Sequence, residues 1–171
     1  LEHPVVFVHG IFARATTFAD GGRGAYFRGV EQRMRELGVQ ASFPKLGFSN
    51  GVSDRADKLA AHLDATWPAG RVNVVAHSIG GLATRDLIVR LGFAGRVASL
   101  TTISTPHRGT GVADWVIRYF GDSTVLELVE AAGFRADALR DLTTQACAEF
   151  NARTPDAPGV VTPPVGGWHD T

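Results

Sequence analysis

The chain has 171 residues, of which 44% are hydrophobic and 20% charged, values ordinary for one globular domain. Lys and Arg together number 17 and so do Asp and Glu, so no net field favours nucleic acid or an anionic membrane as a partner. The apolar runs are far shorter than the ~20 residues that span a bilayer, and a single cysteine, Cys147, excludes an intrachain disulfide.

The chain opens with a predicted strand. PVVFVHG, residues 4–10, is a β-branched apolar run ended by His-Gly, a pattern typical of a strand buried on both faces. A glycine-rich loop follows, and residues 25–38 then favour a helix that stops at Gly38. Residues 39–44 indicate a second, weaker strand.

A longer helix is predicted within residues 51–70. Ser53 suits the N-cap, and apolar residues recur at helical spacing as far as Trp67. The elements predicted next are a strand at 71–76, a helix at 79–91 and a strand at 96–105. Strands that alternate with helices indicate a parallel sheet covered on both faces.

After Pro106 the alternation stops. Residues 111–132 and 134–150 favour helices with no strand between them, which is typical of an inserted helical cap. The remainder is rich in Pro and Gly and offers at most one short strand. We therefore expect one α/β domain over residues 1–171, with a core at about 1–110, a cap at about 111–150 and an irregular tail at 151–171.

A serine lies at the turn between the strand 71–76 and the helix 79–91. The stretch AHSIG, residues 76–80, resembles the G-x-S-x-G elbow of serine hydrolases, with Ala76 in place of the first glycine. Such a turn exposes the Ser78 hydroxyl at the carboxyl edge of the sheet and leaves the Ile79 N–H free to bind an oxyanion. The alternative interpretation is that Ser78 only caps the helix.

The first strand ends in a turn of the same kind. In FVHGIF, residues 7–12, the Ile11 N–H follows His-Gly and is the natural second donor to an oxyanion. An ordinary strand-ending turn is the alternative. Because the alternation places both turns at the carboxyl ends of strands, where open α/β sheets bind ligands, the two patterns support each other.

Three stretches together resemble the secreted bacterial triacylglycerol lipases, the family I or true lipases: VVFVHGI, VNVVAHSIGGL and VASLTTISTPHRGTGVADWV. The resemblance covers roughly residues 4–160, and TPHRGT is its most distinctive part. It implies an α/β-hydrolase: a doubly wound, mainly parallel sheet with a helical lid insertion. It also implies that Ser78 is the nucleophile, that the N–H groups of Ile11 and Ile79 form the oxyanion hole, and that 111–132 is a lid over an acyl-binding cleft.

The general base of such an enzyme follows the serine in the chain, after an acidic residue. The histidines downstream are His107, in a position where the family keeps a structural histidine, and His169, in a tail without the strands that position a base. His9 and His77 flank the two turns, and we interpret them as braces for the loops.

The carboxyl end of the sequence departs from the family. VVTPPVGGWHDT stands where the relatives have a strand, the acid loop and the histidine loop, so the fold is truncated there, split between chains or rearranged after about residue 160. Order alone offers three candidate acids: Asp137, Asp141 and Asp156. The family's calcium site lies in the same missing region, so no metal ligand carries over and no cofactor is expected.

We therefore expect a carboxylic ester hydrolase that acts on acylglycerols or other fatty-acyl esters through a serine acyl-enzyme. The expected partners are a small-molecule or lipid-interface ester substrate, a lipid surface touched by the lid, no nucleic acid, and a second chain if that chain carries the missing acid and base. The resemblance implies a secreted protein, although the sequence shows no signal peptide. The alternatives are a catalytically impaired lipase-like fragment or lipid-binding remnant, and an acyltransferase or thioesterase on the same scaffold.

Overall fold

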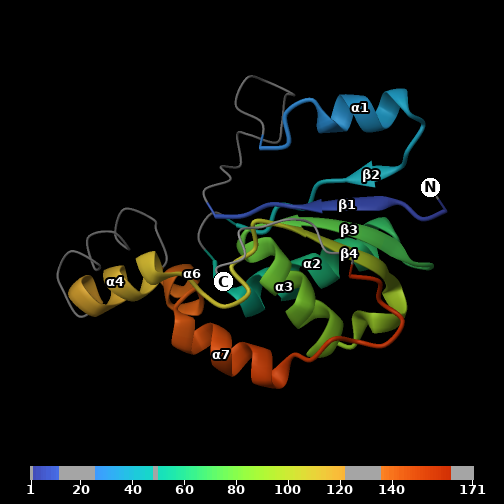
Figure 1. Cartoon of the computed structure of the whole chain (residues 1–171). Helices are drawn as coiled ribbons and strands as arrows, with labels where there is room; N and C mark the ends of the chain where they lie inside the picture. The colour runs from blue at the N-terminus through green and yellow to red at the C-terminus, as the bar shows by residue number, and fades with distance from the viewer. Residues whose placement is uncertain (1, 12–25, 48–49, 122–135, 163–171) are drawn as a thin grey trace.

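A four-stranded parallel sheet forms the centre of the computed structural model, which describes residues 2–11, 26–47, 50–121 and 136–162. Its strands lie in the order β2-β1-β3-β4 (Figure 1). They are β1 (Val5–Val8), β2 (Ala41–Ser42), β3 (Val72–His77) and β4 (Val97–Ile103). The predicted parallel sheet is confirmed.

The register of the sheet brings the carboxyl ends of three strands to one edge. Val8 of β1 is opposite Ala76 of β3, and His77 is opposite Ile103 of β4. Because the strands are parallel, the segments that follow them leave the sheet side by side. The two turns singled out in the sequence therefore meet at this edge.

Three helices cover the sheet: α1 (Val30–Glu36), α2 (Val52–Thr66) and α3 (Ile79–Val89). Right-handed crossovers in this strand order place α1 on one face and α2 with α3 on the other, and Figure 1 shows α1 apart from that pair. Between the sheet and these two helices lies the main core, whose buried residues include Val6, Val8, Leu59, Leu63, Val74, Leu87 and Leu100.

Two predicted helix starts are wrong. Gly29 has a φ of 77°, a left-handed conformation that ends the turn before α1, so that helix begins at Val30 and not near residue 25. The N-cap of α2 is Gly51, and Ser53 lies inside the helix. The cap is instead supplied from a distance, because the Asp141 carboxylate accepts a hydrogen bond from the Val52 N–H at 2.6 Å.

The region predicted to form a helical cap contains α4 (Gly111–Phe120), α6 (Asp137–Asp141) and α7 (Thr144–Arg153). The predicted stretch 134–150 is thus broken, and Thr143 starts α7 by accepting a hydrogen bond from the Ala146 N–H. Figure 1 shows α4 and α6 beyond the end toward which the strands run. The rest of the predicted helix 111–132, from residue 122, lies outside the described residues.

The chain after α7 returns to the sheet. Val161 pairs in parallel with Ser99, through a hydrogen bond from the Leu100 N–H at 2.9 Å and another to the Ala98 carbonyl at 3.1 Å. This pairing lies along the outer edge of β4 and corresponds to the short strand expected in the tail. Among the helices that the structure describes, none is long and apolar enough to cross a membrane.

The contact between α3 and β1 gives a test of this packing. A Cβ on Gly80 would lie 2.9 Å from the Val8 carbonyl oxygen and 3.0 Å from that of His9. We expect Gly80→Ala to lower the free energy of unfolding by about 1–3 kcal/mol. The direction is the opposite of the gain of up to ~1 kcal/mol that alanine brings to an unobstructed helix position. Urea denaturation measures this.

Gly95→Ala is the matched control, because the added Cβ has no atom within 4 Å outside its own local stretch of chain. Its free energy of unfolding should change by less than about 0.5 kcal/mol. A Gly80→Ala protein as stable as the wild type would contradict the close approach of the two elements.

Candidate active site

Ser78 occupies a strained turn. It follows β3 directly and precedes α3, with φ 56° and ψ −135°. Ser78 and Ser104 are the non-glycine residues of positive φ in the described part of the chain. Such conformations cost on the order of 1–3 kcal/mol and persist where the surroundings hold them.

The loop after β4 supplies part of that hold. The Ser78 N–H donates to the Ile103 carbonyl at 2.9 Å. The Ser78 carbonyl accepts from the Thr105 hydroxyl at 2.8 Å and from the Gly81 N–H at 3.0 Å. Both backbone polar groups of the serine are therefore bonded, to the last residue of β4, to the loop after β4 and to α3.

Ile79 begins α3 with a fully buried side chain. The N–H of a first helical residue has no partner within its own helix, and it points out of the helix end. Close packing explains the small residues of the AHSIG stretch. Ala76 is fully buried, and Gly80 lets α3 approach the backbone of Val8 and His9.

The loop after β1 touches the serine. A Cβ on Gly10 would lie 2.7 Å from the Ser78 Cβ, so only a glycine allows this contact. The Gly10 N–H is already engaged, since it donates to the Tyr26 hydroxyl at 2.9 Å. The next residue, Ile11, packs against the buried cluster that contains Ile79. The structure thus brings Ile11, Ser78 and Ile79 together.

A buried arginine holds the carbonyl groups of the same loop. The Arg55 side chain comes from α2 and is fully buried, and it donates to the carbonyls of Gly47 at 3.0 Å, Gly10 at 3.3 Å and His9. Burial lowers the pKa of Arg55 to about 10, so it stays charged at neutral pH. This role was not predicted, although Arg55 lies at helical spacing between the buried Val52 and Leu59.

His9 braces this loop as a neutral ring. Its Nε2 accepts a hydrogen bond from the Leu46 N–H at 3.1 Å, so Nδ1 carries the proton and donates to the Gly10 carbonyl at 2.8 Å. Burial, and then the Arg55 guanidinium, lower the pKa of His9 to about 4.

His77 also has a partner beside the turn. Its Nδ1 is hydrogen bonded to the Tyr26 hydroxyl, and burial lowers the pKa of the ring. Since the same hydroxyl accepts the Gly10 N–H, Tyr26 joins the two turns through one oxygen atom. The sequence carried no local signal for this link, because Tyr26 and His77 are 51 residues apart.

His107 joins β4 to two helices. Its Nδ1 lies 3.4 Å from Nη1 of Arg85, its Nε2 lies 3.2 Å from the Thr102 hydroxyl, and its carbonyl accepts from Asn151 at 2.8 Å. Burial, followed by the Arg85 charge, lowers the pKa of His107. With both ring nitrogens engaged, His107 has the structural role expected from the sequence.

The three candidate acids interact with residues other than Ser78. Asp141 caps α2, with its pKa raised chiefly by burial, and Asp137 forms an ion pair with Arg140 at 3.8 Å. Asp156 lines a small cavity beside α3. The second candidate base, His169, lies outside the described residues.

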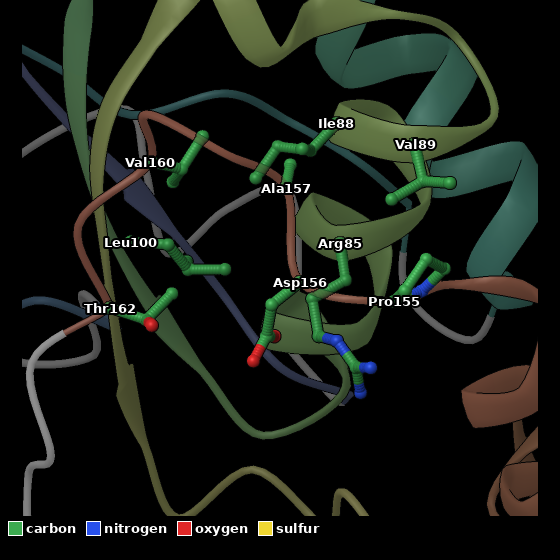
Figure 2. Close-up of a pocket in the computed structure, with 9 residues that line it drawn as sticks. All are labelled: Arg85, Ile88, Val89, Leu100, Pro155, Asp156, Ala157, Val160 and Thr162. Carbon is green, nitrogen blue, oxygen red and sulfur yellow. The ribbon is translucent and has the colours of Figure 1, made fainter.

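The cavity lies between α3, the outer edge of β4 and the chain after α7 (Figure 2). Its lining includes Ile88, Leu100, Asp156 and Val160. About 20 Å³ is available, room for about one water molecule and too little for a fatty acyl chain. It also lies along the second half of α3, and Ile88 is about 13 Å along the helix axis from Ile79. This cavity is therefore not the acyl site.

Within the described ranges, no three His, Cys, Asp or Glu side chains gather in a way that could hold a metal ion. No ligands are therefore assigned to the calcium that the lipase resemblance implies, and no chemistry is assigned to a metal.

The low pKa of His9 predicts that the protein loses stability in acid. The unfolded chain takes up this proton near pH 6.5 and the folded chain only near pH 4, so stability is lost as the pH falls between these values. We expect His9 to remove about 2 kcal/mol of the free energy of unfolding at pH 5.0 relative to pH 7.5. Urea denaturation at the two pH values measures this.

The pKa values of His62, His77 and His107 are lowered too and act in the same direction, whereas the raised pKa of Asp141 acts against them. In a His9→Asn variant the difference between the two pH values should shrink. A wild-type protein equally stable at both would contradict the neutral, buried state of His9.

Comparison with known proteins places this geometry in a family. The model of the palmitoyl protein thioesterase family matches residues 4–148. Triacylglycerol lipase 2 of Saccharomyces cerevisiae is 32% identical, over 79% of this chain and 43% of its own length. The triacylglycerol lipase of Pseudarthrobacter phenanthrenivorans is also 32% identical, over 97% of this chain and 61% of its own length. The chain therefore spans about half the length of such relatives.

A solved structure agrees in fold. The lipase BlEst2 of Bacillus licheniformis, in its mature form, has a TM-score of 0.70 and 24% identity, covering 94% of this chain and 64% of its own. The α/β-hydrolase fold and the resemblance to triacylglycerol lipases are confirmed. The chain belongs to the palmitoyl protein thioesterase family of α/β-hydrolases, among relatives that are triacylglycerol lipases.

Proposed function

We propose that this chain carries the nucleophile and the oxyanion hole of a serine hydrolase that cleaves fatty-acyl carboxylic esters. The observation that carries the proposal is the strained turn at Ser78, held against the glycine of a second strand-ending loop. A serine kept at positive φ between a buried strand and a buried helix offers its hydroxyl at the edge of the sheet. The lipase relatives support an ester as the substrate.

In this proposal the Ser78 hydroxyl attacks the acyl carbonyl. Its proton passes to a general base, and the N–H groups of Ile11 and Ile79 stabilise the negative charge on the carbonyl oxygen. The tetrahedral intermediate collapses to a serine ester as the alcohol leaves with the proton. Water then attacks the acyl-enzyme by the same route and releases the fatty acid.

We assign the general base and its acid to parts of the protein outside the described residues. His9, His77 and His107 each have hydrogen-bond partners that brace loops. The relatives are about twice as long as the stretch they share with this chain, which supports further residues, in the same chain or in a second one, as the source of this pair.

The outer face of α4 supports a lipid interface as the place of reaction. Val112, Trp115 and Tyr119 share this face at spacings of three and four residues, and they are 71%, 55% and 63% exposed. An exposed apolar helix face gains free energy when it enters a lipid surface. We propose that α4 makes this contact; secretion stays a prediction from the sequence.

Replacement of Ser78 tests the proposal. Ser78→Ala should abolish labelling by a fluorophosphonate and lower ester turnover by at least about 10³-fold, because no nucleophile remains. Its unfolding transition should stay cooperative. The control Ser99→Ala removes a hydroxyl that bonds Asn73 near the other end of β4 and should leave labelling unchanged.

Wild-type protein that stays unlabelled would instead favour a lipid-binding remnant without an activated serine. Labelling of Ser78→Ala at the wild-type rate would show that another residue is the nucleophile.

Thioester hydrolysis is a second candidate, which the family match favours. A thiolate leaves the tetrahedral intermediate more readily than an alkoxide, which needs a proton from the base. We expect the chain to hydrolyse matched palmitoyl oxygen esters and thioesters, both through Ser78. Rates of fatty acid release from the matched pair measure this, and cleavage of the thioester alone would reassign the chain as a thioesterase.

A further inference from the structure

We infer that Thr105 is a positioning residue for the oxyanion hole. The Thr105 hydroxyl donates to the Ser78 carbonyl at 2.8 Å. That carbonyl belongs to the peptide unit whose other end is the Ile79 N–H. Because a peptide unit is planar and its C=O and N–H point in opposite directions, a bond that fixes the carbonyl also fixes the direction of the N–H.

The same bond strengthens the Ile79 N–H as a donor. A hydrogen bond accepted by a carbonyl polarises its peptide unit and makes the N–H on the other side more positive. Thr105 would therefore act on the developing oxyanion through the Ser78–Ile79 peptide, without touching the substrate. This inference rests on the proposed role of the Ile79 N–H.

Three features of the loop and helix hold Thr105 in place. Ser104, just before it, has a φ of 48°, which turns the chain back from the end of β4 toward Ser78. Gly81 makes room for the side chain, since a Cβ there would lie 2.7 Å from the Thr105 Cγ2. The second glycine of AHSIGG thus admits Thr105. Branching at Cβ also limits the side-chain rotamers, so the hydroxyl has few directions to choose from.

The two strained serines are linked by this arrangement. The Ser78 N–H bonds the carbonyl of Ile103, and its carbonyl is bonded by Thr105. The residue between these two partners is Ser104, the other non-glycine position of positive φ in the described ranges. The end of β4 and the loop that follows it therefore bond the N–H and the carbonyl of the nucleophile.

The test compares Thr105→Val, which removes the hydroxyl at nearly constant volume, with Thr105→Ser, which keeps it. The first readout is the second-order rate constant for Ser78 labelling by a fluorophosphonate, whose phosphoryl oxygen occupies the place of the oxyanion. We expect Thr105→Val to lower this rate constant about tenfold and Thr105→Ser to stay within about threefold of the wild type.

Thr154→Val is the matched control. It removes a buried threonine hydroxyl that also donates to a backbone carbonyl, that of Phe150 at the end of α7. It should change stability in urea and leave the labelling rate constant within about twofold of the wild type. Labelling of Thr105→Val at the wild-type rate, or equal slowing of Thr105→Val and Thr105→Ser, would overturn the inference.

A second readout does not depend on catalysis. The amide ¹⁵N resonance of Ile79 reports on a hydrogen bond to the carbonyl of the same peptide unit. It should shift in Thr105→Val and keep nearly its wild-type position in Thr105→Ser. An unchanged resonance in Thr105→Val would overturn the inference, whether or not the wild-type protein is labelled. Absence of wild-type labelling would count against the proposed function instead. If Thr105→Val does not fold, Thr105→Ala takes its place in both measurements.

Discussion

The rest of the site depends on one strained turn. Ser78 has a backbone conformation that L-residues avoid, and the surrounding structure must compensate for that cost. It does so with hydrogen bonds to both polar groups of the Ser78 backbone and with two close approaches that only glycine permits, at Gly10 and Gly80. The parallel register of β1, β3 and β4 brings these parts to one edge of the sheet. The strained conformation of Ser78 therefore depends on the topology of the sheet.

The second constraint is a buried positive charge. A buried cation is costly unless it is hydrogen bonded. The two terminal nitrogens of Arg55 donate to the carbonyls of Gly47, His9 and Gly10, whereas its buried Nε has no hydrogen-bond partner among the described residues. Because the guanidinium donates only, it orders carbonyl oxygens around itself. The loop after β1 then has its carbonyls turned toward α2. One residue of that helix thereby shapes a loop that touches the nucleophile.

The elements that follow from local pattern were predictable. Apolar periodicity located β1, β3, α2 and α3 to within a few residues, and the AHSIG stretch located the turn at Ser78, because strand, turn and helix are adjacent in the chain. The wrong start of α1 has a local cause, the left-handed Gly29, whereas the wrong start of α2 depends on a contact between distant residues. The cap of α2 comes from Asp141, 89 positions away, and no local reading of Ser53 could anticipate it.

The same reason explains which site residues were overlooked. Tyr26, Arg55 and Thr105 act on the two turns through hydrogen bonds to residues 16 to 51 positions away in the chain, and their types are common in surface helices and loops. One sequence pattern could have indicated Arg55, because it lies among the buried residues on one face of α2. A second pattern could have indicated Thr105: the elbow pattern does not require a glycine at Gly81, and this glycine makes room for the Thr105 side chain.

The single cysteine gives the molecule a built-in reporter. The Cys147 thiol is buried where α7 meets the loop before α4, and it donates to the carbonyls of Pro106 at 3.6 Å and Asp141 at 3.4 Å. Burial raises the pKa of this thiol and so keeps it protonated. A thiol-reactive dye can therefore reach it only when the cap separates from the core. The rate of that modification reports how often α7 separates from the loop before α4, and the measurement needs no engineered label.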